Sequence, residues 1–348
     1  MMNNSLMQKE IAEQPDVMRR LLEEERPNVE QLAGVIRQRA PRFVVFAARG
    51  SSDNAARYGQ YLFGAAHGLP VALATASLFT LYKQPPRLDE ALVLGISQSG
   101  QSPDIVSILE EGRRQGALTV GITNEPGSAL ATTAEYTLSL RTGPERSVAA
   151  TKTYTASLMV LAMVSAALSQ DAARFQTLQA LPDALDQVLA SAAGILQTAQ
   201  GYRAMEACVV VSRGYNYATA FEIALKLKEL TYVLAEPYSS ADFQHGPLAL
   251  VERGFPVVAI VPDGAVTQEQ VDLLRQLHGQ GAELIVISAQ PEALALAGAP
   301  LPLPAGLPEW ISPLVAVVPG QLLALGLALA KGFDPDHPRS LHKVTKTW

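Results

Sequence analysis

The chain has 348 residues, 48% of them hydrophobic and 17% charged, which excludes a disordered chain and predicts two domains with sizeable cores. The net charge of −6 argues against a nucleic-acid-binding surface, which needs clustered basic residues, but a pocket could still hold a small anion. The single cysteine, Cys208, excludes an internal disulfide, and its apolar surroundings predict a buried side chain.

The sequence predicts neither a signal peptide nor a membrane span. The segment Met1–Ser5 lacks the basic and apolar regions of a signal peptide. The longest apolar stretch, Pro313–Ala330, is interrupted by Pro319, Gly320 and Gln321, so we expect a buried helix there. Together with the cysteine content, these features predict a cytoplasmic protein without a membrane partner.

The chain opens with amphipathic helical patterns over residues 1–40, punctuated by Pro15 and Pro27. Short β-rich runs then alternate with helical patterns, which predicts βαβ units and a mostly parallel, doubly wound sheet. The strands predicted for this half are Phe43–Ala48, Val71–Thr75, Leu92–Ile96, Thr119–Thr123 and Tyr136–Leu140.

The same rhythm returns later in the chain, at an offset close to 164 residues. We therefore expect two tandem three-layer α/β/α modules related by internal duplication. The predicted plan is a helical segment (1–40), a first module (41–185) and a second module (186–348), joined by a helical stretch around 172–192. The matching landmarks are Val44–Gly50 with Val209–Gly214, Leu92–Gly100 with Val257–Gly264, and Arg114–Ala117 with Gly279–Ala282.

A hydroxyl-rich turn, Ser97–Asp104, follows the strand Leu92–Ile96. Ser102 is placed as a helix N-cap and Pro103 as the first helical residue, so free N–H groups should face an anion in the turn. An ordinary serine-rich capping turn is the alternative. The second module has Val261–Gly264 at the matching place, which predicts one phosphate site per chain.

Two further polar turns follow strands of the first module, Arg49–Asn54 and Glu145–Lys152. Because the carboxyl ends of parallel strands lie at one edge of a sheet, we expect the three turns to converge on one crevice. The sequence contains neither the GxGxxG fingerprint of dinucleotide binding nor a P-loop.

In the second module, Phe221–Glu229 has the pattern of a helix with Glu222, Lys226 and Glu229 on one face. A solvent-facing ladder of ion pairs is the alternative. The mostly apolar continuation, Leu230–Pro237, favours a packed helix whose polar stripe faces a cavity.

His245 lies in a tight Gly-Pro turn within Ser239–Pro247, in a loop rather than on an apolar helix face, which argues against a core histidine. The sequence has no CxxC, HExxH or paired-histidine spacing, so we expect no metal site and no cofactor. Near the C-terminus, two prolines stiffen Asp334–Arg339, and we expect this tail to lie over the fold and to desolvate Lys343 partly.

These motifs resemble the sugar isomerase (SIS) family, in particular the isomerase modules of glucosamine-6-phosphate synthases and the stand-alone SIS-type glucosamine-6-phosphate deaminases. The resemblance runs from Glu10 to the C-terminus. It is carried by Ser97–Gly100, Val148–Lys152, Ala224–Glu229, His245–Leu248 and Asp336–Lys343.

The resemblance implies a site for a sugar phosphate. Glu229 would move the proton between C1 and C2, His245 would open the sugar ring, and Lys343 would form a Schiff base with the ketose; Lys226 joins this catalytic set. A homodimer is also implied, in which His245 reaches the neighbouring subunit's site. The implied phosphate- and substrate-binding residues are Gly50, Ser51, Ser52, Ser97, Gln98, Ser99, Ser102, Val148 and Ala150.

The sequence also departs from the synthase pattern. It has no counterpart of the glutaminase domain, so we expect no use of glutamine as the ammonia source. Ala150 lacks the hydroxyl of the synthase pattern, and Ser239–Gln244 is closer to the deaminases. We therefore favour deamination of glucosamine 6-phosphate to fructose 6-phosphate. A deglycase for fructose-amino-acid 6-phosphates and a non-catalytic phosphosugar-binding regulator are the alternatives.

Overall fold

The computed structural model describes residues 5–344. Its internal contacts divide the chain into two compact units, each of which holds one sheet. Unit 1 comprises Met1–Ala12, Arg146–Thr151 and Asp183–Leu341, and unit 2 comprises Glu13–Glu145, Lys152–Pro182 and His342–Trp348.

This division differs from the predicted boundaries at 40/41 and 185/186, because the first helices do not form a segment of their own. Helix α1 (Leu6–Ala12) packs on α16 (Ser312–Ala330) in unit 1. Helices α2 (Gln14–Glu24) and α3 (Arg26–Arg39) pack on α8 (Lys152–Ser169) in unit 2. The apolar faces of these helices, rather than their order in the chain, therefore decide which unit they join.

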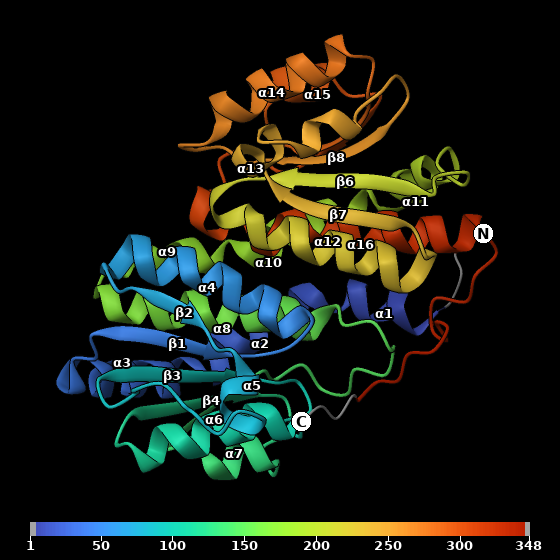
Figure 1. Cartoon of the computed structure of the whole chain (residues 1–348). Helices are drawn as coiled ribbons and strands as arrows, with labels where there is room; N and C mark the ends of the chain where they lie inside the picture. The colour runs from blue at the N-terminus through green and yellow to red at the C-terminus, as the bar shows by residue number, and fades with distance from the viewer. Residues whose placement is uncertain (1–4, 345–348) are drawn as a thin grey trace. The chain divides into compact units, whose positions relative to one another are not determined.

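Unit 2 contains a parallel five-stranded sheet in the order β2-β1-β3-β4-β5 (Figure 1). All five strands predicted for the first half are present. Every residue of β3 and β4 is buried, which explains why these strands have nearly continuous apolar sequences. The strands are β1 (Phe43–Ala47), β2 (Val71–Leu73), β3 (Ala91–Ile96), β4 (Leu118–Thr123) and β5 (Tyr136–Ser139).

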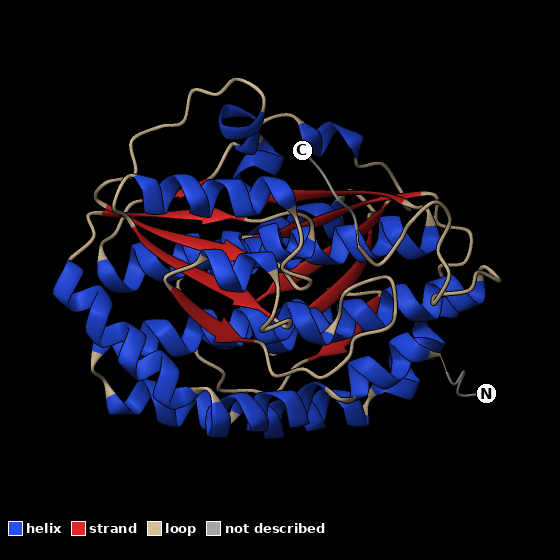
Figure 2. Ribbon diagram, turned by 90° about the horizontal axis from the view of Figure 1, so that it is seen from below, coloured by secondary structure: helices blue, strands red, loops and turns tan. Residues whose placement is uncertain are grey.

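Helices flank the strands (Figure 2). In unit 2, α8 packs against α2, α3 and α4, and α6 packs against α5, α7 and the sheet. Pro15 and Pro27 lie in the first turns of α2 and α3, where a missing N–H costs little, so the predicted punctuation is confirmed. The remaining helices of this unit are α4 (Ser51–His67), α5 (Ala76–Thr80), α6 (Pro103–Arg114), α7 (Ala129–Thr133) and α9 (Ala172–Gln179).

Unit 1 repeats this topology, with a parallel sheet in the order β10-β9-β8-β6-β7. Corresponding strands begin at residues 43 and 207, 71 and 234, 91 and 256, 118 and 283, and 136 and 299, which are separations of 163 to 165 residues. The same strand order at a constant offset confirms the predicted duplication. The strands are β6 (Ala207–Ser212), β7 (Leu234–Ser239), β8 (Pro256–Val261), β9 (Glu283–Ser288) and β10 (Ala299–Pro302).

The predicted buried helix near the C-terminus is α16, which packs against α11 and α12. It approaches α12 so closely that a Cβ atom on Gly320 would collide with Ile223. The segments Lys152–Ser169 and Glu309–Ala330 are long and apolar enough to cross a membrane, but 83% and 89% of them are buried within the fold, as in core helices of globular proteins. The other helices are α10 (Leu181–Ala190), α11 (Ala192–Gln200), α12 (Tyr217–Thr231), α13 (Ser240–Gln244), α14 (Thr267–Gly279), α15 (Pro291–Ala295) and the 3₁₀ helices η1 (Gly214–Asn216), η2 (Pro247–Leu250) and η3 (Glu309–Ile311).

Residues 334–341 of the C-terminal tail lie over unit 1, in agreement with the prediction that the tail lies over the fold. The carboxylate of Asp336 accepts hydrogen bonds from the backbone N–H groups of Leu6 (2.8 Å) and Met7 (3.0 Å), at the start of α1. The guanidinium of Arg339 lies 3.6 Å from the centre of the Tyr232 ring, and its backbone N–H donates to the Tyr232 hydroxyl (2.9 Å). The tail therefore both caps α1 and packs on α12.

Replacing Asp336 by alanine should destabilise unit 1 by about 1 kcal/mol, because the first N–H groups of α1 lose their acceptor. The free energy of unfolding from urea denaturation tests this expectation. Asp336→Asn keeps one carbonyl acceptor and should lose less. Equal stability of Asp336→Ala and the wild type would contradict a capping role.

Candidate active site

The hydroxyl-rich turn after β3 has the geometry of an anion cradle. Ser102 is the N-cap of α6, with an extended backbone, and Pro103 begins the helix, as predicted. The Ser102 hydroxyl accepts no capping hydrogen bond from the N–H groups of the helix. The positive end of the α6 dipole therefore faces the turn together with this hydroxyl.

The backbone of the turn is held by its own serines. The Ser97 hydroxyl accepts a hydrogen bond from the Gly100 N–H (3.1 Å), and the Ser99 hydroxyl accepts one from the Gln101 N–H (3.3 Å). Gly100 has φ = 60°, and a Cβ atom at this position would collide with the Ser128 side chain. The turn thus requires glycine both for its backbone conformation and for its close approach to α7.

The turn after β1 meets the turn after β3, as expected for two strand ends at one sheet edge. The Arg49 side chain donates to the fully buried Asp104 carboxylate (Nε to Oδ2, 2.8 Å) at the start of α6. Gly50 (φ = 55°) precedes α4, and Ser51 and Ser52 are the first two residues of that helix, both half-buried. The ion pair therefore joins the start of α6 to the turn before α4, and this turn leads into the predicted binding residues Gly50, Ser51 and Ser52.

The structure brings Lys343 to the same region. A cavity of about 420 Å³ is lined by Gln98, Ser99 and Gln101 of the turn, by Ser128, and by Lys343 from the tail. The Lys343 amine lies 2.6 Å from the Glu145 carboxylate (Nζ to Oε2). An amine from the end of the chain and the predicted phosphate turn therefore share one cavity of unit 2.

The third predicted turn is divided between the two units. Its ends, Glu145 and Lys152, belong to unit 2, and residues 146–151 belong to unit 1. Within unit 1 the Glu10 carboxylate accepts hydrogen bonds from the backbone N–H groups of Arg146 and Ser147 and from the Ser147 hydroxyl. Val148 and Ala150 are half-buried in this segment, and their roles in binding remain predictions.

The polar stripe of α12 is buried rather than exposed to solvent, so the alternative of a surface ladder is wrong. The Lys226 amine lies 2.6 Å from Glu229 and 3.4 Å from Glu222, and the side chains of Lys226 and Glu222 are fully buried. Burial alone lowers the pKa of Lys226, but the two carboxylates raise it, and the net effect is a pKa above the ordinary value. Lys226 therefore remains a cation and fixes the orientation of the Glu229 carboxylate, whose side chain is 22% exposed.

His245 is exposed and lies in the predicted turn, between α13 and η2. Its backbone N–H donates to the carbonyl of Asp242 (3.0 Å), and Gly246 follows with φ = 144°. The Ser240 hydroxyl at the start of α13 donates to the Glu269 carboxylate (2.9 Å). The histidine is thus presented at the surface of unit 1 by a short helix tied to α14.

The corresponding turn of the second module is occupied by a carboxylate of the chain itself. The Ala265 N–H donates to Glu309 (2.8 Å), and a Cβ atom on Gly264 would collide with the same carboxylate. A Cβ atom on Gly214, the counterpart of Gly50, would lie 2.8 Å from Glu309 Oε1. This arrangement supports the prediction of one phosphate site per chain, in the first module.

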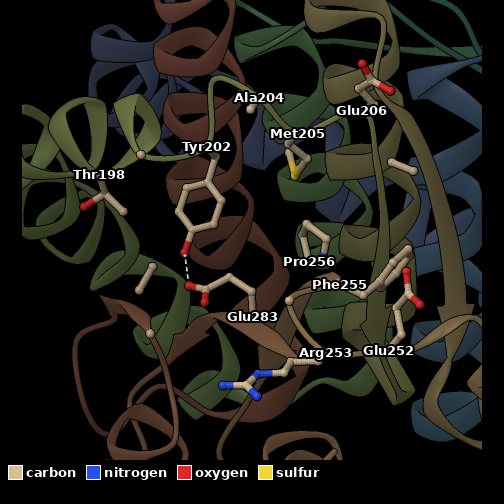
Figure 3. A pocket seen from close by; sticks show the side chains of 15 residues that line it. Thr198, Tyr202, Ala204, Met205, Glu206, Glu252, Arg253, Phe255, Pro256 and Glu283 are labelled. Atoms are coloured by element: carbon tan, nitrogen blue, oxygen red, sulfur yellow. Dashed lines mark hydrogen bonds between the residues drawn. The ribbon is translucent and has the colours of Figure 1, made fainter. Parts of the chain in front are cut away.

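A larger cavity, about 880 Å³, lies elsewhere (Figure 3). It is at the amino ends of β6, β8, β9 and β10, whereas ligands of parallel sheets bind at the carboxyl ends. Tyr202 donates to Glu283 (2.7 Å), and burial and this contact raise the pKa of Tyr202 above its ordinary value. The structure describes all the predicted site residues, and none lines this cavity.

Within the described residues, neither a metal-binding cluster nor a reactive cysteine has support. Residues 5–344 contain no group of three or more His, Cys, Asp or Glu side chains that could hold a metal ion. Cys208 is buried, as predicted, and burial raises the pKa of its thiol to about 12. This cysteine therefore has the character of a small core residue rather than a nucleophile.

The chain matches the SIS domain model over residues 39–167 and 205–330, which are the two modules. It belongs to the SIS domain family. The glutamine–fructose-6-phosphate aminotransferase of Methanothermobacter thermautotrophicus is 35% identical to this SIS protein over 97% of the chain. The SIS protein spans 56% of that relative's length.

Solved structures resemble the SIS protein over nearly its whole length. A Silicibacter pomeroyi protein described as a candidate phosphosugar isomerase is 35% identical, with a TM-score of 0.86, over 95% of this chain and 100% of that one. The C-terminal domain of glucosamine-fructose-6-phosphate aminotransferase from Francisella tularensis is 27% identical, with a TM-score of 0.86, over 97% and 99%. A glucosamine-6-phosphate deaminase from Thermotoga maritima, 21% identical with a TM-score of 0.76 over 99% and 100%, shares the fold.

Replacing Gly100 by alanine should destabilise the protein by about 1–3 kcal/mol and weaken binding of glucose 6-phosphate, because the new Cβ strains the backbone and displaces Ser128. Urea denaturation and calorimetric titration with glucose 6-phosphate measure the two effects.

Gly127→Ala is the matched control for this prediction. Gly127 lines the same cavity, but a Cβ atom there would have no heavy atom within 4 Å. We expect stability and binding close to those of the wild type. A Gly100→Ala protein that binds as tightly as Gly127→Ala would show that the turn does not hold the phosphate.

Proposed function

We propose that this chain is a phosphosugar isomerase acting on an amino-hexose 6-phosphate, and that it converts glucosamine 6-phosphate and water into fructose 6-phosphate and ammonia. The observation that carries the proposal is the cavity of unit 2, in which an anion-type turn and the Lys343 amine lie together. A turn suited to phosphate and an amine in the same cavity suit a phosphorylated sugar with a carbonyl carbon. The similarity to aminotransferase isomerase domains supports the same substrate class.

The proposed mechanism begins with ring opening by His245. Glu229 then removes the proton from C2 of the aldose and delivers it to C1, which converts the C2 amine into a C2 imine. Lys343 replaces the substrate nitrogen at C2 and releases ammonia, and water hydrolyses the resulting Schiff base to fructose 6-phosphate. In this scheme Lys226 orients Glu229 through their 2.6 Å contact.

The phosphate would be held by the turns of unit 2. The α6 N-terminus, Gln98, Ser99 and Ser102 offer donors there, and Gly50, Ser51 and Ser52 follow the neighbouring strand. The buried Ser97 hydroxyl accepts a hydrogen bond from Gly100, so in the proposed site it shapes the turn while its own O–H can donate to phosphate.

We further propose a homodimer in the cytoplasm. Exposure of His245 at the surface of unit 1 is compatible with its insertion into a neighbouring subunit's site. Sedimentation of the full chain should give a dimer mass. A chain that remains monomeric yet fully active would exclude the shared site.

One assay tests the proposed reaction. The enzyme is incubated with glucosamine 6-phosphate, and ammonia and fructose 6-phosphate are measured in parallel; we expect equimolar products. Fructoselysine 6-phosphate and glucose 6-phosphate serve as competing substrates. Turnover of fructoselysine 6-phosphate alone would indicate a deglycase, and binding without turnover of any of them would indicate a regulator.

Glu229→Gln should lower turnover by about 10²–10⁴-fold while binding of substrate persists, because the amide keeps the shape but cannot accept the proton. Exchange of the C2 proton with solvent deuterium, followed by NMR, measures this step. Glu236→Gln, at an exposed position on β7, is the control and should exchange normally. Exchange at the wild-type rate in Glu229→Gln would require another base.

A further inference from the structure

The Lys343 amine has a specific anchor in unit 2. Its Nζ lies 2.6 Å from Oε2 of Glu145, and the Glu145 side chain is fully buried whereas that of Lys343 is 23% exposed. The two side chains therefore differ in burial: the carboxylate lies in the core, and the amine lies at the edge of the cavity. The ion pair with the buried carboxylate therefore fixes the position of the amine.

The Glu145 carboxylate is itself held rigidly. The backbone N–H of Thr153 donates to Oε1 (3.0 Å), and the Thr153 hydroxyl donates to Oε2 (2.7 Å). Thr153 is the second residue of α8, so the carboxylate lies at the positive end of that helix. Two donors and the helix dipole therefore stabilise the charge before the lysine is added.

The amine held in this way faces the predicted substrate cavity. Lys343 lines the cavity of about 420 Å³ together with Gln98 and Ser99 of the hydroxyl-rich turn. An ion pair with a purely structural role could lie anywhere on the surface. Here the pair places a nucleophilic nitrogen beside the group proposed to bind phosphate, which is what a reaction at a sugar carbon requires.

We propose that Glu145 is the positioning residue for Lys343: its buried carboxylate holds the amine at the edge of the cavity and accepts the proton that the amine must lose. The proposal rests on the proposed function, in which Lys343 forms an imine at C2. The amine is a nucleophile only as the neutral base, so an adjacent proton acceptor is needed.

The proposed step balances in atoms and charge. The Lys343 ammonium passes one proton to Glu145, and the nitrogen lone pair forms a bond to C2 of the substrate imine. Glu145 then returns this proton to the substrate nitrogen, and a second proton passes from the Lys343 nitrogen to the substrate nitrogen. The bond between that nitrogen and C2 breaks, and the electron pair leaves on nitrogen as ammonia. Lys343 is left as the protonated Schiff base and Glu145 as the carboxylate.

The test compares full-length wild type and Glu145→Gln in borohydride trapping with fructose 6-phosphate, read by mass spectrometry as one hexose phosphate added at Lys343. We expect the rate of adduct formation to fall about 10- to 100-fold, because a misplaced reacting group costs of this order. Binding of glucitol 6-phosphate, which has no carbonyl, should stay within about two-fold of the wild type, since the phosphate contacts are intact. Glu145→Asp should restore the rate partly.

Two further measurements separate positioning from general damage to the fold. Glu145→Gln should still exchange the C2 proton of glucosamine 6-phosphate with solvent while its ammonia release falls. Glu135→Gln, which breaks the 2.9 Å ion pair with Arg39 in the same unit, is the matched control and should trap the adduct at the wild-type rate.

The outcomes distinguish this inference from the proposed function. An adduct that forms equally fast in Glu145→Gln and the wild type overturns the role of Glu145 and leaves the imine in place. No adduct at Lys343 in the wild type overturns the imine step of the proposed function itself. If Glu145→Gln does not fold, Glu145→Asp decides, and a wild-type trapping rate in that variant overturns the inference.

Discussion

Parallel strand pairing is the constraint on which the arrangement of this protein depends. Each parallel strand must be followed by a crossover, so every carboxyl end and every following helix N-terminus lies at the same edge of its sheet. In unit 2 this brings the turns after β1 and β3 together, with Arg49 and Asp104 joining them. Backbone N–H groups and serine hydroxyls gather there, so a chain with a net charge of −6 still has donors suited to the proposed phosphate.

The duplicated modules differ in the turns at the carboxyl ends of their strands, although their sheets have the same topology. In the first module the turn is rich in hydroxyls and borders a cavity that includes Lys343. In the second module the matching turn has lost the hydroxyls, and Glu309 supplies a carboxylate to the Ala265 N–H. An anion from within the chain thus occupies the turn whose counterpart in the first module is proposed to hold the phosphate. The strand order and spacing are nevertheless the same in both.

Buried charges are costly unless they are paired, so their placement is informative. Lys226 is balanced by two carboxylates on its own helix, and Glu145 by a helix N-terminus, a threonine and a lysine from the tail. In each case the partner that remains partly exposed, Glu229 or Lys343, is the one to which chemistry is ascribed. The buried partner supports and orients the exposed one.

The sequence by itself was sufficient for features whose cause is local. Buried parallel strands produce continuous apolar runs, and the i, i+4, i+7 spacing alone places Glu222, Lys226 and Glu229 on one helix face. Tertiary structure decided the rest. Glu145 and Lys343, which form an ion pair, are 198 residues apart in the sequence. The residues next to Glu309 in the sequence do not indicate that its carboxylate accepts a hydrogen bond from the Ala265 N–H. The division of the N-terminal helices and the tail between the units was likewise decided by packing. Periodicity carries information only within one element, whereas contacts between distant residues exist only once the apolar faces have packed.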